Sequence, residues 1–420
     1  MDFFSSTMTI YITLAAVFGI FMAWGIGAND VANAMATSVG SKAITIKQAV
    51  LIAAFFEFVG AYLAGGEVTN TIRKGIISMD ALGGDINLLI WGMLASLLAA
   101  GTWLLIASLK GWPVSTTHSI VGAVIGFAAV GIDVNAVHWD KVSNIVLSWI
   151  VSPMIAGAIA FAVFKSIQKF VIDTTEPLKN AIKFGPIYLF MVGFVIALVT
   201  IKKGLKHVGI DIHGGMEFVY AVLIGGMIAF IGILLIRRIK FNDASEKRFH
   251  FANVEKIFAI LMIFTASAMA FAHGSNDVAN AVGPMAAVIS AAQSGELASK
   301  SELPGWVLFV GGTGIVIGLA TLGYKVIRTV GENITELTPS RGFSAEIGAA
   351  TTVVLASYTG LPISTTQTLV GAILGVGLAR GIAAIDLRVM GNIFMSWVVT
   401  LPAGAILSIV FFYMLQAIFG

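Results

Sequence analysis

The sequence predicts an all-α polytopic membrane protein, and three observations support this fold class. Of the 420 residues, 58% are hydrophobic and only 11% are charged, and the mean hydropathy is +0.94. The apolar runs have the length of membrane-crossing helices, about 20 residues, and lack the alternating pattern of a barrel strand. The third observation is an internal repeat, which predicts inverted-topology repeats of five spans with helices broken at the membrane midplane.

Twelve apolar runs are expected to form transmembrane helices. They cover residues 8–28, 45–65, 86–108, 114–131, 142–164, 185–201, 215–236, 254–290, 305–324, 343–358, 363–380 and 389–418. The eighth and twelfth runs exceed one straight crossing, so these helices should be tilted, broken or extended beyond the bilayer. The N-terminus lacks the basic region and cleavage site of a signal peptide, so the first run is expected to be a span.

The basic residues indicate the orientation of the chain. If the N-terminus lies outside, 18 of the 25 Lys and Arg residues fall in cytoplasmic loops or at their edges. This predicts a multi-pass protein of the cell inner (plasma) membrane with both termini outside the cytoplasm. Arg73 and Arg328 have similar contexts and are expected to extend from span ends towards water. The alternative is that an arginine here attracts phosphate from solution. The net charge of +3 does not indicate nucleic-acid binding, and without cysteine there is no thiol chemistry.

One polar motif occurs twice inside apolar runs. Residues 27–34 read Gly-Ala-Asn-Asp-Val-Ala-Asn-Ala, and residues 274–281 repeat seven of these eight residues. The polar members are Asn29, Asp30 and Asn33 in the first copy and Asn276, Asp277 and Asn280 in the second. Side chains three or four residues apart share a helix face, and polar groups in hydrocarbon indicate function. The alternative is that Asn-Asp caps a helix break, but the duplication favours a site.

A second motif, Gly-x-Pro-Val/Ile-Ser-Thr-Thr, starts at residue 111 and again at residue 360. Proline is tolerated in the first turn of a helix, so half-helices are expected to begin at Pro113 and Pro362. Each brings three hydroxyl groups, from Ser115, Thr116 and Thr117 and from Ser364, Thr365 and Thr366. With the free N–H groups and the dipole of the first turn, they predict an oxyanion site. The alternative is that the hydroxyls only cap the helix.

The spacing of the motifs predicts the domain organisation. The copies are offset by 247 and 249 residues, and two unduplicated spans, 185–201 and 215–236, lie between the halves. Five spans plus two is an odd number, so the second repeat enters the membrane in the opposite direction. We expect a first inverted repeat over residues 1–164, a two-span linker with charged, solvated loops over 165–250, and a second inverted repeat over 251–420. The linker spans should form a static frame, compatible with a homodimer interface.

The two aspartates require positive charge nearby. A carboxylate about 4 Å from an anion would repel it by roughly 4 kcal/mol at an effective dielectric near 20. Neither motif contains Lys or Arg. A small hard cation with oxygen ligands fits this arrangement best, and two aspartates allow two such cations. Sodium is the expected ion, because a divalent metal usually brings more carboxylates.

The two motif pairs resemble those of the inorganic phosphate transporters, a family of sodium- or proton-coupled phosphate symporters with inverted repeats. The resemblance covers residues 25–164 and 272–413. It implies that the motif residues line phosphate and cation sites, and that Glu57 and Glu346 are accessory cation ligands. Either glutamate could instead form a structural hydrogen bond between helices. Met93 stands where many members carry a third glutamate, and the long loop of animal members is absent, which indicates a prokaryotic form.

The predicted function is sodium-coupled symport of inorganic phosphate into the cell, with at least two sodium ions per phosphate and no enzymatic activity or resident cofactor. The expected phosphate ligands are Asn33, Ser115, Thr116, Thr117, Asn280, Ser364, Thr365 and Thr366, and the expected sodium ligands are Asn29, Asp30, Asn276 and Asp277. One alternative is proton-coupled symport of phosphate or a metal–phosphate complex, with His118 or a glutamate carrying the proton. A sulfate permease and an anion channel are further alternatives.

Overall fold

A computed structural model describes residues 7–203, 212, 214–241, 251–294, 303–333, 337–381 and 387–420. In these ranges the regular elements are helices, apart from one isolated antiparallel bridge between Ile77 and Val137. The predicted all-α class is therefore confirmed.

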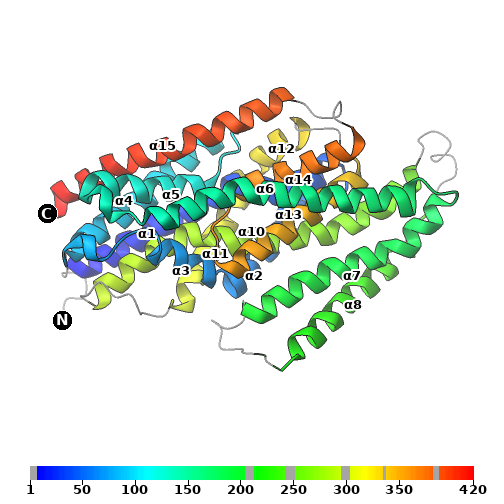
Figure 1. Cartoon of the computed structure of the whole chain (residues 1–420), viewed down its shortest axis with the longest axis horizontal. Helices are drawn as coiled ribbons and strands as arrows, with labels where there is room; N and C mark the ends of the chain where they lie inside the picture. The colour runs from blue at the N-terminus through cyan, green and yellow to red at the C-terminus, as the bar shows by residue number, and fades with distance from the viewer. Residues whose placement is uncertain are drawn as a thin grey trace.

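The N-terminal half of the chain runs from α1 to α6 (Figure 1). Its helices are α1 (Thr7–Gly40), α2 (Ile46–Ala64), α3 (Gly66–Lys74), α4 (Ile86–Leu109), α5 (Thr116–Gly126) and α6 (Trp139–Ile167). A capping box starts α2: the Thr45 hydroxyl accepts a hydrogen bond from the Gln48 backbone N–H, and the Gln48 side chain accepts one from the Thr45 N–H. This cap fixes where α2 begins.

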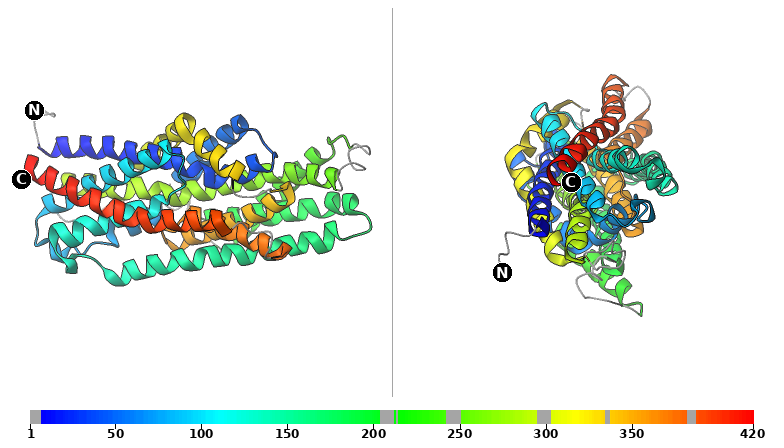
Figure 2. Two further views of the ribbon diagram at one scale, coloured as in Figure 1. Left: turned by 90° about the horizontal axis from the view of Figure 1, so that it is seen from above. Right: turned by 90° about the vertical axis from the view of Figure 1, so that its left-hand side faces the viewer.

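The C-terminal half repeats this order of long and short helices. It comprises α10 (Ala252–Ser294), α11 (Gly305–Gly318), α12 (Tyr324–Asn333), α13 (Pro339–Thr359), α14 (Thr365–Arg380) and α15 (Leu387–Phe419). The long eighth span is one continuous 43-residue helix, α10, even though it contains Pro284. The start of α1 and the end of α15 lie at the same end of the molecule (Figure 2).

Two helices, α7 (Pro177–Lys203) and α8 (Met216–Ile236), connect the halves. They form a hairpin at the edge of the bundle (Figure 1), in which α7 also packs against α10 and α13. The expected charged loop over residues 165–183 is mostly helical, which corrects the prediction. A π-helical turn over Gln168–Ile172 continues α6, and α7 begins five residues later. Lys165 and Lys169 are exposed on helical turns. Their charges therefore do not require a long loop between α6 and α7.

Nine helices in the described ranges are long and apolar enough to cross a bilayer, and they coincide with nine of the twelve predicted spans. The other three predicted spans, 114–131, 343–358 and 363–380, correspond to α5, α13 and α14. These helices carry many of the buried polar side chains, including Thr116, Glu346 and Thr365. α5 and α14, with 11 and 16 residues, are too short to cross a bilayer, whereas α13 has 21 residues and its polar side chains lower its hydropathy.

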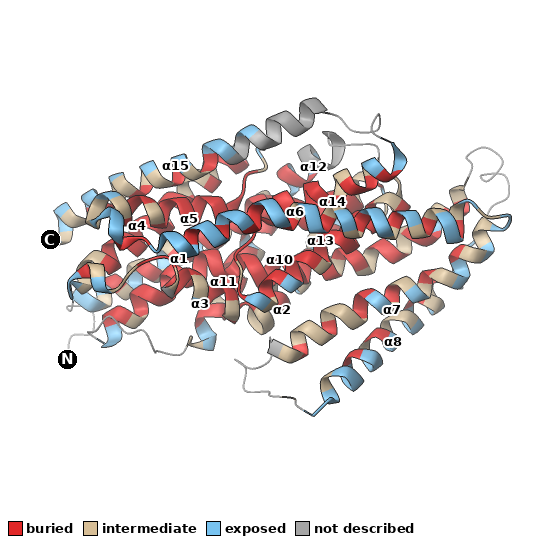
Figure 3. Cartoon of the chain, in the orientation of Figure 1, coloured by how far each residue is buried: buried red, intermediate tan, exposed pale blue. Residues whose placement is uncertain are grey.

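The interior of the bundle is formed by α1, α4, α10 and α13, whereas α6 and α8 present apolar faces to the outside (Figure 3). The motif glycines allow close helix packing here. A Cβ atom on Gly27 would lie 1.9 Å from the Ile315 carbonyl oxygen, and one on Gly274 would lie 2.1 Å from that of Glu57. Glycine at these two positions brings α1 against α11 and α10 against α2, with the polar motif at the centre.

Candidate functional site

The repeated Gly-x-Asn-Asp motif lies within unbroken helices. Both α1 and α10 continue through the motif, and all six of its polar side chains are at most 3% exposed. Neither copy of the motif breaks its own helix, although the first asparagine of each copy forms hydrogen bonds with backbone groups at the break between two neighbouring helices. The side chains instead project from the two central helices into the protein interior.

The chain breaks occur at the second motif, between α4 and α5 and between α13 and α14. Gly111 (φ +68°) and Gly360 (φ +71°) adopt the left-handed conformation that glycine tolerates best. The helices that follow begin at Thr116 and Thr365, not at the two prolines as predicted. The reason is the cap residue, because a serine hydroxyl stands one position before each helix.

These serines act as N-caps. The Ser115 hydroxyl accepts a hydrogen bond from the His118 backbone N–H at 3.2 Å, and the Ser364 hydroxyl accepts one from the Gln367 N–H at 3.2 Å. Each cap satisfies one backbone donor of the first turn and fixes where the helix starts. The capping interpretation of the hydroxyls thus holds for the serines, while the threonines make different contacts.

The threonines connect the two motif pairs across the repeats. Asn33 on α1 donates to the Thr366 hydroxyl at 2.8 Å and to that of Thr365 at 3.3 Å. In return, Asn280 on α10 donates to the hydroxyls of Thr116 and Thr117, both at 3.2 Å. The two hydrogen-bond sets are reciprocal, so the amide of each repeat lies at the helix N-terminus of the other.

Each aspartate, by contrast, contacts the threonine of its own repeat. Thr116 donates to Asp30 Oδ2 at 2.7 Å, and Thr365 donates to Asp277 Oδ2 at 2.9 Å. Oδ1 of both aspartates is buried and has no hydrogen-bond partner among the described residues. A buried carboxylate oxygen without a donor is strongly unfavourable unless a positive charge lies close by. The two Oδ1 atoms are therefore candidate cation ligands.

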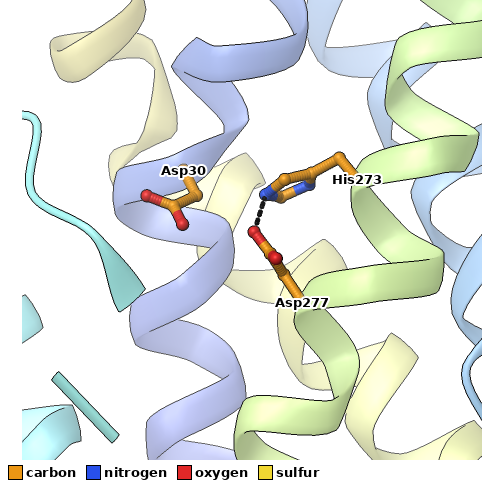
Figure 4. Close-up of side chains that lie close together, drawn as sticks. All are labelled: Asp30, His273 and Asp277. Carbon is orange, nitrogen blue, oxygen red and sulfur yellow. Dashed lines mark ion pairs between the residues drawn. The ribbon is translucent and has the colours of Figure 1, made fainter. Parts of the chain in front are cut away.

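A histidine that the sequence analysis missed lies beside these aspartates. His273 Nε2 is 2.9 Å from Asp277 Oδ2, and its Nδ1 is 3.2 Å from Glu57 Oε1. One side-chain ligand atom from each of Asp30, His273 and Asp277 lies within 4.8 Å of the others (Figure 4). The available signal was a histidine one helical turn before Asp277.

The first asparagine of each motif holds the adjacent chain break. Asn29 donates to the Trp112 carbonyl at 2.9 Å and accepts from the Val114 N–H at 3.1 Å. Asn276 donates to the Leu361 carbonyl at 3.2 Å, but its Oδ1 has no hydrogen-bond partner among the described residues. Both amides fix the segments that lead into α5 and α14, and Asn276 keeps a free oxygen.

Glu346 on α13 lies in a cluster of three hydroxyl groups. Its Oε1 accepts hydrogen bonds from Thr37 at 2.6 Å and Ser38 at 2.5 Å, and its Oε2 accepts one from Thr265. The carboxyl group thereby joins α1, α10 and α13 in the buried interior. These oxygen atoms could serve a cation or only tie the three helices together.

Three other residues singled out in the sequence occupy different surroundings. Arg73 is only 3% exposed, because α3 packs against α10, so the expectation that it extends into water is wrong. Arg328 is exposed on α12, in agreement with that expectation. His118 packs against Trp149 with 3.8 Å between ring centroids and 34° between the ring planes, at the edge of a largely apolar groove of about 900 Å³ between α6 and α14.

Amides, hydroxyls and carboxylates buried at the centre of a bundle of apolar helices define a membrane transport protein. Comparison with known proteins identifies the family of transport proteins to which the chain belongs. Residues 26–408 match the phosphate transporter family, and the chain belongs to this family. The family that the motifs indicated is thus confirmed.

Similar proteins are known from bacteria and plants. A Haemophilus influenzae protein, provisionally named a phosphate permease, is 53% identical over 421 residues and covers 100% of both chains. Inorganic phosphate transporter 2-1, chloroplastic, of Arabidopsis thaliana is 43% identical over 96% of this chain and 71% of its own. A solved structure described as the sodium-dependent phosphate transporter superimposes with a TM-score of 0.90 at 41% identity, covering 97% of this chain and 100% of that one.

Proposed function

We propose that this protein is a symporter that uses sodium to carry inorganic phosphate into the cell. The observation that carries the proposal is the set of reciprocal hydrogen bonds between the two motif pairs, in which the asparagine of each half donates to threonines of the other half. It places two buried aspartates, each with an Oδ1 atom that lacks a donor, beside amide and hydroxyl donors and two helix N-termini. The solved relative described as sodium-dependent supports sodium as the coupling ion.

In this proposal the anion binds between the N-termini of α5 and α14. Amide and hydroxyl groups donate hydrogen bonds to its oxygen atoms, together with backbone N–H groups of the first turns. The donors are Asn33, Asn280, Thr116, Thr117, Thr365 and Thr366. Ser115 and Ser364 contribute by holding each helix start in place. The donors come from both repeats, so the anion would be enclosed from two sides.

Sodium binds at the aspartates in this proposal. The Oδ1 atoms of Asp30, Asp277 and Asn276 are the free oxygen ligands, and Asn29 positions the break beside them. When ionised, the two aspartates contribute two negative charges to the buried site. The helix ends supply only about half a charge each, which balances a phosphate monoanion. At least two sodium ions are therefore needed, and Glu57 or Glu346 is a candidate ligand for a third.

The inverted arrangement of residues 1–164 and 251–420 and the location of both termini outside the cytoplasm are also part of this proposal. Symmetry-related helices meeting at a central site are typical of secondary transporters that alternate access around it. The reciprocal hydrogen bonds between the repeats support this arrangement. The hairpin of α7 and α8 would remain static, and a homodimer could form through it.

Proton coupling is the alternative with a structural basis, because His273 and Glu57 are buried groups able to carry protons. Uptake of labelled phosphate into proteoliposomes distinguishes the two mechanisms when sodium and proton gradients are imposed separately. We expect uptake with the sodium gradient alone, rising sigmoidally with sodium. Uptake driven by protons without sodium would contradict sodium coupling. A Hill coefficient of one with equal fluxes of sodium and phosphate would contradict the charge argument.

A further inference from the structure

The groove of about 900 Å³ lies between α6 and α14, with further lining residues from α5 and α15. Apart from His118 and Gln367, the residues that line it are apolar or glycine. Large side chains at its rim are exposed, among them Ile150 at 59% and Met154 at 69%. The helix that carries them, α6, is long and apolar enough to cross a bilayer, and exposed residues follow its length (Figure 3). The groove therefore opens towards lipid chains and not towards water.

Glycines form the floor of this groove and bring α6 and α14 together. A Cβ atom on Gly371 would lie 2.2 Å from the Pro153 carbonyl oxygen, and one on Gly375 would lie 2.0 Å from that of Gly157. The larger lining side chains, such as Phe161, stand on either side of this contact. The result is an apolar channel that is open on one side. A hydrocarbon chain can fill it, and without one its walls would lose dispersion contacts.

Two basic residues lie at one end of the groove. Lys165 follows the lining residue Phe161 by one helical turn on α6, so the two share a helix face. Arg380 follows the lining residue Leu378 by two positions, in the last turn of α14. The successive glycine contacts show that α6 and α14 run in the same direction, so these two helix ends lie at the same level. Both basic side chains are exposed, which makes this end of the groove positive.

The opposite end of the groove is level with the central site. Trp149 Nε1 donates to the carbonyl group of Pro362, in the break before α14, at 3.3 Å, and the indole packs against His118. Lys165 lies sixteen helical positions from Trp149, which is about 24 Å at 1.5 Å per residue. Transporter sites lie near the membrane midplane, and half a bilayer with its headgroups is about 20–22 Å thick. The groove therefore spans one leaflet, with the basic residues at headgroup depth.

We propose that this groove binds an anionic phospholipid. An acyl chain lies along the glycine floor and reaches Trp149, and the phosphate group lies at Lys165 and Arg380. Basic residues between membrane helices at headgroup depth are suited to anionic lipids. A second copy of the chain fits less well, because a two-fold symmetric dimer would place groove against groove and leave both unfilled. The inference goes beyond the proposed symport and does not depend on it.

Quenching of tryptophan fluorescence by brominated lipid tests the position of the acyl chain. The full-length protein is reconstituted into phosphatidylcholine vesicles that contain a small fraction of phosphatidylglycerol with brominated chains, or the same fraction of brominated phosphatidylcholine. The difference between the wild type and Trp149→Phe isolates the signal of Trp149. We expect half-maximal quenching of Trp149 at an about 30-fold lower fraction of the anionic lipid, because each basic residue contributes about fivefold.

Substitutions at the basic residues test the position of the phosphate group. Lys165→Gln combined with Arg380→Gln should reduce the roughly 30-fold preference for phosphatidylglycerol to nearly one. Arg237→Gln combined with Arg238→Gln is the matched control. These two arginines are also exposed at the end of an apolar helix, α8, but do not line the groove, so the preference should stay as in the wild type.

Filling the groove tests the site itself. Ala158 lines the groove, and Ala158→Phe should lower the quenching of Trp149 by either lipid at least about fivefold, because the ring occupies the space of the acyl chain. Ala162 is exposed one turn further along α6 and does not line the groove. Ala162→Phe, the matched control, should leave the quenching unchanged.

Native mass spectrometry gives a second measurement that needs no variant to fold. The wild-type protein should retain phosphatidylglycerol in preference to phosphatidylcholine when both are supplied in equal amounts. Equal retention and equal quenching of the two lipids would show bulk lipid only and would overturn the proposal, as would an undiminished preference after loss of Lys165 and Arg380. A dimer that Ala158→Phe disrupts, without quenching of Trp149 in the wild type, would assign the groove to a second copy instead. Failure of the proposed symport would leave these lipid measurements unchanged, because none of them measures transport.

Discussion

Asp30 in the first half and Asp277 in the second half have similar contacts on the side that faces the helix N-termini. On the opposite side their contacts differ. Towards the helix N-termini, Asp30 and Asp277 each accept one threonine hydrogen bond, at 2.7 and 2.9 Å. On the opposite side, Asp277 contacts His273, whereas the equivalent position near Asp30 holds Ile26. The duplication has kept the contacts expected to serve the transported ions, and the halves differ in the residue that lies behind each aspartate.

Replacing the aspartates should have the largest effect. It tests the feature that both halves share, a buried aspartate expected to bind a cation. We expect Asp30→Asn and Asp277→Asn each to reduce sodium-driven phosphate uptake by at least about 100-fold, because each removes a buried charge that a cation must pair with. Uptake into proteoliposomes measures the effect, with thermal melting in detergent as the control for folding. Sodium-dependent uptake at the wild-type rate in either variant would refute the cation role of that aspartate.

Paired threonine substitutions ask whether the two helix N-termini contribute equally. Thr116→Ala with Thr117→Ala, and Thr365→Ala with Thr366→Ala, should each weaken phosphate binding by about 1.5–3 kcal/mol, or roughly 10- to 150-fold. The reciprocal asparagine contacts predict similar losses for both pairs. Titration calorimetry with phosphate at saturating sodium measures them. Normal binding combined with early melting would show that the threonines serve only the fold.

The site residues of the Asn-Asp motifs were predictable from sequence because their chemistry conflicts with their surroundings. An aspartate and two amides in an apolar run have few structural explanations, and Asp30 and Asp277 occur at one repeat offset. The helical spacing then placed Asn33 and Asn280 on the same faces. The order of helices followed from apolar run lengths, which the bilayer thickness sets.

Other features depended on tertiary contacts. His273 is paired with Glu57, which lies on another helix 216 positions earlier, so only the folded chain shows the pair. Proline as a first-turn signal predicts starts for α5 and α14 at Pro113 and Pro362, but the serine caps set the boundary three residues later, at Thr116 and Thr365. The burial of Arg73 results from the packing of α3 against α10, which hydropathy does not reveal.

Replacing the serine caps should have the smallest effect. It tests a feature that should be the same in both halves, the N-cap hydrogen bond. Ser115 and Ser364 accept the same hydrogen bond, at 3.2 Å in both cases. Replacing an N-cap serine by alanine costs about 1 kcal/mol, whereas glycine costs only a few tenths. We therefore expect Ser115→Ala and Ser364→Ala to lower the melting temperature in detergent by similar small amounts, and the glycine variants to melt nearly as the wild type does.

The phosphate affinity of the serine variants completes this test. Because each serine oxygen already accepts a backbone hydrogen bond, the hydroxyl acts as a cap, and its loss should change phosphate binding by less than the threonine pairs do. Titration of Ser115→Ala and Ser364→Ala with phosphate measures this difference. A tenfold loss of affinity in either variant, without a change in melting, would make that serine a phosphate ligand. If only one of the two variants lost phosphate affinity, the two halves would differ at the anion site as well as behind the aspartates.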